Sequence, residues 1–258
     1  MAGSSRRDDD FLVGGINAVD EILRRRERPL AVLFCRERPG PRLAALIDRA
    51  KAAGATVKTV PDQQLDRLCG HRRHQGVVAR VAPVAAVSLE KLLASLDPAR
   101  QPVLLAVDEI KDPQNLGSII RTAAAAGAAG LLLPDRRTAG LSPTVAKVAS
   151  GGLEYLPVCR VGNLVGALEK CRERGFWLAG TVVDGGTSIY AADLRRPLVL
   201  VVGSEARGLR PLVRRTCDLL LTIPMHAALN SLNVAAATAV VLFEIRRQQD
   251  NGAAGRGE

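Results

Sequence analysis

The sequence has few aromatic residues, no paired cysteines and no long apolar run. Phe, Trp and Tyr make up 3% of its 258 residues, which argues against RNA-binding modules that stack bases on aromatic rings, such as the RRM and the OB-fold. None of the five cysteines belongs to a Cys-x-x-Cys pair, so no metal site is expected. An odd number of cysteines with no secretion signal is typical of reduced cytosolic thiols. Since no apolar run approaches the ~18 residues of a membrane span, we expect a cytoplasmic protein with no membrane partner.

Basic residues outnumber acidic ones, and the excess is uneven. The formal net charge is +10 and the sequence pI is about 10.0, which favours a polyanionic partner, nucleic acid first. Residues 1–83 carry 16 Lys and Arg against 10 Asp and Glu, whereas residues 84–258 carry 20 against 16. Because the richness in Arg and Ala would also fit a GC-rich genome, charge alone leaves the partner open.

The first part of the chain is expected to form a small α/β domain over residues 11–83. Helices and strands alternate there, as in compact α/β units. The expected helices are 15–25, 41–53 and 61–68, and the expected strands are 30–35, 56–60 and 76–81. Residues 1–10 are polar and charged, and we expect a disordered tail.

A second α/β domain is expected over residues 101–248, after a linker at 84–100 that includes a helical patch. The run 198–202 is apolar throughout, as in parallel strands buried on both faces. Other strands are expected at 103–107, 131–133, 176–181 and 219–223, and helices at 116–126, 144–150, 164–174 and 232–248. Residues 249–258 are expected to be a second disordered tail.

Three polar segments follow expected strands of this second domain. Asn115 comes after strand 103–107, with Arg121 further along the same expected helix, and Glu205 comes after strand 198–202. The C-terminal edge of a parallel sheet is where α/β proteins bind ligands. No Gly-x-Gly-x-x-Gly follows any expected strand, which argues against a dinucleotide-binding fold.

The third segment is 223–233, where the last strand leads into an apolar helix. Ile223, Met225 and Leu232 offer the apolar slot that an adenine needs. Ser231 is expected to cap a helix beginning at Leu232. Its inward stripe would be Leu232, Ala235, Ala236, Ala239, Val240, Leu242 and Phe243.

Each of these residues also has an ordinary structural interpretation. Asn115 would serve as a plain helix cap, Gly203 as a turn glycine, and Ile223, Met225 and Leu232 as core residues. The functional interpretation rests on the three segments together.

In this order and spacing the three segments resemble motifs 1, 2 and 3 of the SPOUT RNA methyltransferases of the TrmH family. The matching stretches are 115–122, 202–209 and 230–234, and the resemblance covers about residues 101–248. It implies a C-terminal SPOUT domain with a parallel sheet and a trefoil knot, which general rules of chain topology would not suggest. It also implies S-adenosylmethionine (SAM) as the cofactor, methylation of ribose 2′-hydroxyls, and a homodimer whose interface forms the active site.

The resemblance assigns site residues by position. Asn115 and Arg121 would be the motif 1 pair near the ribose, and Glu205 the motif 2 acid. The implied catalytic set is Asn115, Arg121, Glu205, Ser231 and Asn233, and the implied cofactor-binding set is Gly203, Ile223, Met225 and Leu232. The sequence departs from the family at Ala206 and at 226–228, where the family often has glycine, and both departures concern loop shape.

The N-terminal part carries a second resemblance. Residues 13–19 and 74–79 are similar to the two ends of the ribosomal-protein-like RNA-binding domain of the bacterial 23S rRNA guanosine 2′-O-methyltransferases. This two-domain layout implies ribosomal RNA more than tRNA as partner. His74 is either an RNA contact or a structural turn residue, and the basic runs 24–26 and 71–73 are candidate phosphate contacts.

The sequence therefore predicts SAM-dependent 2′-O-methylation of a ribose, that of a guanosine, in 23S rRNA. The alternatives are a tRNA 2′-O-methyltransferase, an antibiotic-resistance rRNA methyltransferase and a non-catalytic ribosome-assembly factor. Intact Asn115, Arg121 and Asn233 argue against the last. A free guanidinium is not a base under ordinary conditions, so Arg121 either orients the hydroxyl or acts as a base with phosphate help.

Overall fold

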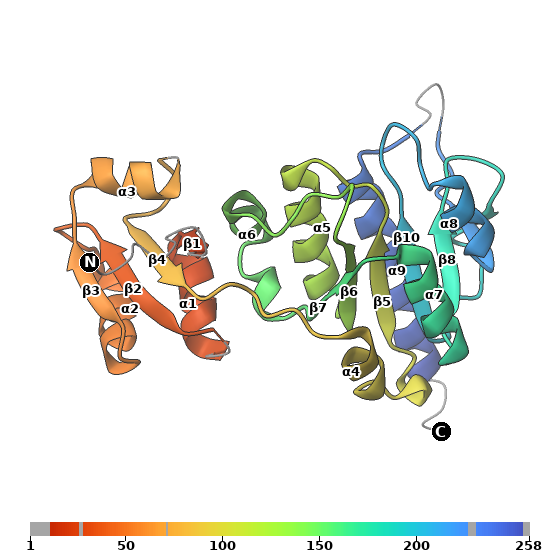
Figure 1. Cartoon of the computed structure of the whole chain (residues 1–258), viewed down its shortest axis with the longest axis horizontal. Helices are drawn as coiled ribbons and strands as arrows, with labels where there is room; N and C mark the ends of the chain where they lie inside the picture. Colours follow the sequence, from red (N-terminus) through yellow and green to blue (C-terminus); the bar gives the residue numbers. More distant parts are fainter. Residues whose placement is uncertain (1–10, 26–27, 71, 227–230, 255–258) are drawn as a thin grey trace, which may run out of the picture. The chain divides into compact units, whose positions relative to one another are not determined.

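The structure is a computed structural model that describes residues 11–25, 28–70, 72–226 and 231–254. The chain forms two compact units, one of residues 1–85 with 141–154 and one of residues 86–140 with 155–258 (Figure 1). The expected tail 1–10 and residues 255–258 of the expected second tail lie outside the described residues. None of the described helices is long and apolar enough to cross a membrane.

The first unit is built on a four-stranded sheet in the order β1-β4-β2-β3. Strand β4 runs antiparallel to β1 and β2, whereas β2 and β3 are parallel. Its elements are β1 (Phe11–Gly14), α1 (Ile16–Arg25), β2 (Leu30–Cys35), α2 (Pro41–Ala52), β3 (Thr56–Thr59), α3 (Asp62–Cys69), β4 (Val77–Val81), α6 (Pro143–Ala149) and the short η3 (Gly152–Glu154). The expected helices and strands of 15–81 are present, while β1 was not expected.

Residues 141–154 join the first unit although they lie between two strands of the second. The Arg28 guanidinium and the Glu154 carboxylate form a buried ion pair with an N–O distance of 2.6 Å, and Arg25 donates a hydrogen bond to the Glu154 carbonyl. Such a long-range pairing has no local signature in the sequence.

The second unit contains a seven-stranded parallel sheet in the order β7-β6-β5-β10-β8-β11-β9. The strands are β5 (Val103–Val107), β6 (Gly130–Pro134), β7 (Val158–Val161), β8 (Trp177–Thr181), β9 (Thr187–Ser188), β10 (Leu198–Val202) and β11 (Leu219–Thr222). The helices are α4 (Leu89–Ala94), the short η2 (Pro98–Arg100), α5 (Pro113–Ala125), α7 (Leu164–Glu173), α8 (Pro211–Thr216) and α9 (Val234–Ala254).

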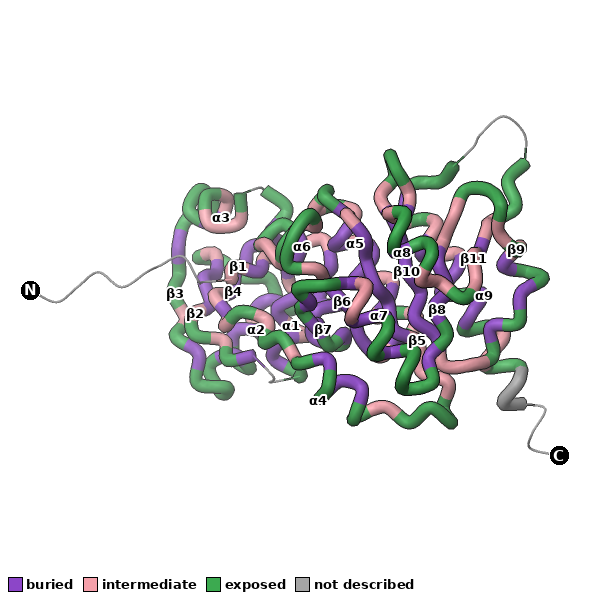
Figure 2. The backbone as a smooth tube through the Cα atoms, turned by 45° about the vertical axis from the view of Figure 1, so that its right-hand side comes forward, coloured by how far each residue is buried: buried purple, intermediate pink, exposed green. Residues whose placement is uncertain are grey.

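The core of this unit surrounds β10, whose five residues are all buried, as the apolar run predicted. Helices α4, α7 and α8 bury leucines, alanines and valines against one face of the sheet, while α5 and α9 pack together (Figure 1). The tube in Figure 2 is purple along the central strands. Since α4 contributes Leu89, Leu92 and Leu93 to this core, part of the expected linker is packed into the second unit.

Helix α9 differs from its prediction at the start, on its face and at the end. It begins at Val234, and its first turn is capped by the Asn233 side chain, not by Ser231. The buried residues of α9 are Val234, Thr238, Val241, Leu242, Glu244 and Ile245, whereas Ala236 and Phe243 of the expected stripe are exposed. Because alanines bury little area, they mark the buried face of a helix only weakly, and the prediction of the inward stripe was wrong. The helix also continues through residues 249–254, where a tail was expected.

The parallel arrangement brings the ends of β5, β10 and β11 to one edge of the sheet. The segments that follow these strands carry the three motifs, so the fold gathers them there. The trefoil knot stays a prediction.

Candidate active site

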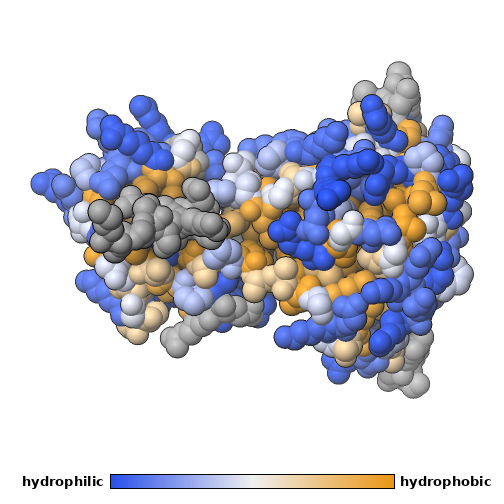
Figure 3. Space-filling model, viewed as in Figure 1, coloured by the Kyte–Doolittle hydropathy of each residue, from blue (hydrophilic) through white to orange (hydrophobic). Residues whose placement is uncertain are grey.

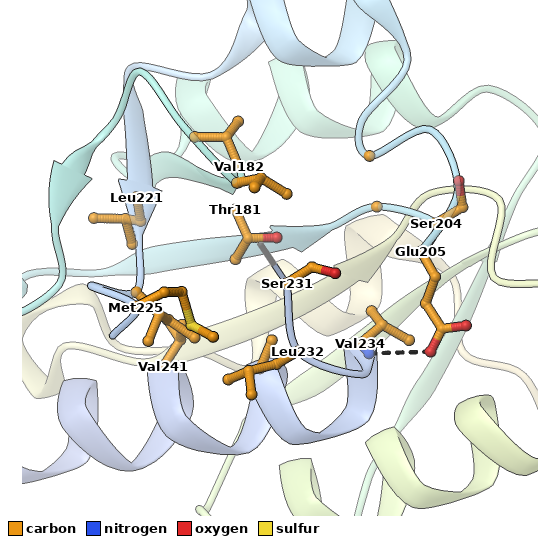
Figure 4. Close-up of a pocket in the computed structure, with 15 residues that line it drawn as sticks. Thr181, Val182, Ser204, Glu205, Leu221, Met225, Ser231, Leu232, Val234 and Val241 are labelled. Carbon is orange, nitrogen blue, oxygen red and sulfur yellow. Dashed lines mark hydrogen bonds between the residues drawn. The ribbon is translucent and has the colours of Figure 1, made fainter. Parts of the chain in front are cut away.

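A pocket opens at this edge between the loop after β10, the segment after β11 and the first turns of α9 (Figure 4). Its apolar wall includes Leu221, Ile223, Met225, Leu232 and Val241, and its polar side includes Ser204, Glu205 and Ser231. All four residues expected to bind the cofactor, Gly203, Ile223, Met225 and Leu232, line this pocket. Met225 and Leu232 remain 37% and 38% exposed, so they are surfaces of the pocket and not core residues.

Gly203 is required by the loop itself. Ser204 and Gly208 exchange two backbone hydrogen bonds of 3.1 and 2.8 Å, which close the loop tightly. A Cβ on Gly203 would lie 2.2 Å from the Gly208 carbonyl carbon, far inside van der Waals contact. The resemblance assigned Gly203 to the cofactor site, and the structure adds a reason that lies within the loop itself, the close approach of the Gly208 backbone.

Asn115, Glu205 and Asn233 come together beside the pocket. The Glu205 Oε1 accepts hydrogen bonds from Asn115 Nδ2 at 3.1 Å, Asn233 Nδ2 at 2.6 Å and the Val234 N–H at 3.3 Å. Asn233 Nδ2 also donates to Asn115 Oδ1 at 2.9 Å. One carboxylate thus joins the first turn of α5, the loop after β10 and the first turn of α9, where the helix dipole favours a negative charge.

The helix starts explain how these side chains are placed. Asp112, and not Asn115, caps α5 by accepting a hydrogen bond from the Gln114 N–H at 2.9 Å, and Pro113 follows in the first turn. Asn115 is therefore not needed as the cap of α5, and its side-chain amide donates a hydrogen bond to Glu205. The Asn233 Oδ1 caps α9 by accepting from the Ala235 N–H at 2.9 Å, which leaves both protons of its Nδ2 for Glu205 and Asn115.

A second hollow, the polar cleft, adjoins this cluster. Its lining is Glu109, Ile110, Lys111, Asp112, Asn115, Ser204, Glu205, Ala206, Arg207 and Val234. Ser204, Glu205 and Val234 line both hollows. The apolar pocket and the polar cleft therefore adjoin at Glu205, the carboxylate that joins the cluster.

Two of the expected catalytic residues stand apart from the cluster. Arg121 is exposed on α5, lines neither hollow, and makes no hydrogen bond or ion pair with any residue that the structure describes. Ser231 is exposed and lines the pocket. One chain alone therefore brings together three of the five.

The pairing of Asp108 with Arg210 was not predicted from the sequence. Asp108 follows β5 directly and is fully buried, and its carboxylate accepts hydrogen bonds from the Arg210 backbone N–H at 2.8 Å and from Arg210 Nε at 2.6 Å. The pair fastens the end of the β10 loop to the end of β5. The available signal was an acid placed directly after a buried apolar strand.

In the first unit, the structure favours the structural interpretation of His74. The ring is 3% exposed, its Nδ1 accepts a hydrogen bond from the Gly76 N–H at 3.0 Å and its Nε2 lies 3.1 Å from Asp66 Oδ1. Both ring nitrogens are thus occupied within the unit. Of the two basic runs, Arg24 and Arg72 reach the surface with exposed side chains, while residues 26 and 71 lie outside the described residues.

Among the residues that the structure describes, no cluster of three or more His, Cys, Asp or Glu side chains is arranged to hold a metal ion.

Known proteins match both halves of the chain. The SpoU rRNA Methylase family matches residues 102–243. A second family, described as RNA 2'-O ribose methyltransferase substrate binding, matches residues 12–86. Among the bacterial relatives, some carry the TrmH family name, which confirms the resemblance that the motifs suggested.

Two relatives and one solved structure show how far the similarity extends. The chain is 39% identical over 242 residues to the 23S rRNA (guanosine-2'-O-)-methyltransferase RlmB of Shewanella oneidensis, covering 92% of this chain and 97% of that protein. It is 47% identical over 204 residues to the uncharacterized tRNA/rRNA methyltransferase slr0955 of Synechocystis, covering 79% of this chain and 53% of that longer protein. The SpoU methyltransferase AviRb from Streptomyces viridochromogenes, crystallised with AdoMet, has a TM-score of 0.80 at 25% identity and covers 96% of each chain. The chain belongs to the SpoU rRNA methylase family.

Proposed function

We propose that the protein is a SAM-dependent RNA methyltransferase that methylates the 2′-hydroxyl of a guanosine ribose in 23S rRNA, in the cytoplasm. The observation that carries this proposal is the Asn115–Glu205–Asn233 cluster, which lies where an apolar pocket adjoins a polar cleft. Family membership and the name of the Shewanella relative supply the reaction and the RNA.

The pocket has the chemistry that SAM requires. Ile223, Met225 and Leu232 give an apolar surface for the adenine, and Ser204 and Ser231 place hydroxyls beside it for the polar part of the cofactor. When bound, SAM supplies a methyl group already activated by a positively charged sulfur. The remaining task of the protein is to place the ribose hydroxyl in line and to manage its proton, and such positioning lowers a barrier by up to ~7–11 kcal/mol in ideal cases.

Asn115, Glu205 and Asn233 hold the edge of the polar cleft where the ribose would sit. Because the two amides bond to each other and to one carboxylate, their positions are fixed before RNA arrives. Ser231 lines the pocket close to this edge and adds a hydroxyl that can contact ribose or cofactor.

Arg121 acts across a homodimer in this proposal. It lies outside both hollows of its own chain and is exposed. Its helix α5 packs beside α9, where Phe243 is 52% exposed, an arrangement suited to burial against a second copy. Arg121 of one copy would then orient the hydroxyl at the other copy's site and stabilise the developing negative charge. A guanidinium keeps its proton at ordinary pH.

The N-terminal and C-terminal domains have different roles in this proposal. Residues 11–83 would bind the RNA substrate and residues 101–248 would carry methyl transfer, joined by 84–100. The match of residues 12–86 to a substrate-binding family and the concentration of basic charge in residues 1–83 support this division.

Mapping of 2′-O-methyl groups tests the proposal. In a strain that lacks the gene, one 2′-O-methylguanosine of 23S rRNA should be absent. The wild-type gene should restore it and the Arg121→Ala variant should not. Loss of a tRNA methyl group, or of none, would contradict the proposed substrate.

A further inference from the structure

A third hollow of the second unit, here called the arginine groove, is not used by the site described above. Its five arginines are Arg136, Arg137, Arg207, Arg210 and Arg215. They come from the loop after β6, the loop after β10 and helix α8. The groove is open to solvent, and its lining contains no aromatic side chain.

The arginine groove continues from the polar cleft. Glu109 and Arg207 line both hollows, so a chain lying in the groove would pass directly to the Asn115–Glu205 edge. The Ala139 N–H donates a 2.7 Å hydrogen bond to the Ile110 carbonyl, which fastens the loop after β6 to the loop after β5. The two hollows therefore share one wall.

The charges of the arginine groove are only partly neutralised. Arg137 lies 3.6 Å from the Glu109 carboxylate and Arg210 lies 2.6 Å from Asp108. Arg136, Arg207 and Arg215 are exposed, and none of them forms an ion pair with a residue in the described part of the chain. In Figure 3 hydrophilic side chains gather over the loops at the upper side of the second unit.

The backbone at the groove is held in an uncommon conformation. Glu109 and Arg137 have φ angles of 59° and 65°, in the left-handed region that non-glycine residues rarely occupy. Such conformations occur at turns and helix ends as well as at binding sites, and here they belong to the two partners of one ion pair.

We propose that the arginine groove binds the sugar-phosphate backbone of the substrate RNA beside the target nucleotide. This inference rests on the proposed function for the identity of the RNA. Guanidinium groups form paired hydrogen bonds with phosphate oxygens, and phosphate contacts fix the register of a nucleic acid without reading its sequence. A groove with arginines and no aromatic rings suits that task, and it would hold the strand so that one ribose stops at the cleft.

A charge-matched pair of double variants tests the inference. Arg136→Gln with Arg215→Gln removes two unpaired groove charges. The control, Arg174→Gln with Arg214→Gln, removes two exposed arginines of the same unit that do not line the groove. The probe is 23S rRNA purified from a strain lacking the gene, and the affinity of each protein for it is measured over a range of salt concentrations.

The groove variant should bind this RNA about tenfold or more weakly, and its slope of log K against log salt should become shallower by about 1.4, since each phosphate contact contributes about 0.7 for single strands. The control should keep the wild-type affinity and slope, and both should keep wild-type SAM affinity. Equal RNA binding by groove variant and control would overturn the inference, as would a loss of SAM affinity that accounts for the effect. If wild-type protein binds this RNA but transfers no methyl group to it, the proposed function fails while the groove is still tested by the binding comparison.

Discussion

The side-chain amide of Asn233 donates a 2.9 Å hydrogen bond to the Oδ1 of Asn115, which lies 118 residues earlier in the chain. The same amide nitrogen donates to Glu205 at 2.6 Å, while the Asn233 oxygen caps α9. The side-chain oxygen of Asn233 thus caps α9, while its side-chain nitrogen holds Glu205 and Asn115 in the cluster. A substitution can remove the second role and keep the first.

Asn233→Ser and Asn233→Ala should separate them. Serine keeps an acceptor for the helix cap but loses the amide donor, so methyl transfer should fall while thermal stability stays near wild type. Alanine also loses the cap, which costs about 1 kcal/mol and should lower Tm by roughly 2–4 °C. Thermal melts and single-turnover methylation check this. Equal stability of the two variants would show that the cap contributes nothing.

The proposed SAM pocket is best probed at Leu232. Its side chain lines the pocket and is already 38% exposed, so Leu232→Gln should leave the fold intact and weaken SAM binding about tenfold, or ~1.4 kcal/mol. Tyr190→Gln, at an exposed ring outside the pocket, is the matched control, and calorimetry measures both. Gly203 is the poorer probe because any side chain there meets the Gly208 backbone. If a folded Leu232→Gln protein kept wild-type SAM affinity, Leu232 would not contact the bound cofactor.

Two cysteines should be unreactive in the folded protein. Burial raises the pKa of Cys171 and of Cys217 to about 12. The reactive thiolate is therefore scarce at pH 7 and becomes abundant only as the pH approaches 12. Alkylation with iodoacetamide, followed by mass spectrometry, should label both residues slowly at pH 7 and rapidly after denaturation. Rapid labelling of Cys171 in the native state would mean that α7 opens readily.

Local elements could be predicted because local signals determine them. The five apolar residues of β10 predicted a strand buried on both faces, and its bounds are 198–202 as expected. The two-residue strand β9 was missed because so short a segment carries too little pattern, and the four-residue strand β7 was missed as well. Residues 141–154 belong to the first unit because α6 packs on β1 and η3 on α1 and because Arg28 pairs with Glu154, and all of these contacts join residues far apart in sequence.

The roles of the site residues were predictable only through resemblance. The expected strand ends placed Asn115, Glu205 and the segment 223–233 at one edge of the sheet, but neither composition nor spacing predicted that Asn115 and Glu205, which are 90 residues apart, would share a hydrogen bond. Ser231 and Asn233 are both good cap residues, and the sequence selected the wrong one. The contact of Asn233 with Glu205 favours the later helix start, and that contact is tertiary. Asp108 needs its Arg210 partner to be recognised, and that partner lies 102 residues away.

Arg121→Ala should leave SAM binding nearly intact and destroy methyl transfer, because Arg121 does not line the pocket. Removal of one donor that stabilises developing negative charge typically costs ~10²–10³ in rate. Arg121→Lys should restore little, since the planar fork of the guanidinium is lost. Calorimetry and single-turnover assays at saturating SAM measure the two effects, and a larger loss in SAM affinity than in turnover would reverse the assigned roles.

Mixed dimers then decide whether Arg121 acts on its own chain or on a second copy. Light scattering should first give a dimer mass at micromolar concentration. The proposed interface has to be a stable one, and stable interfaces typically bury more than ~1,200 Å². Arg121→Ala and Asn233→Ala chains, each inactive alone, are co-expressed. If Arg121 acts across the interface, a mixed dimer has one site with both replacements and one intact site, so random pairing makes about a quarter of all sites active. If Arg121 acts within its own chain, every site in every dimer carries one replacement, and the mixture should be as inactive as its parents.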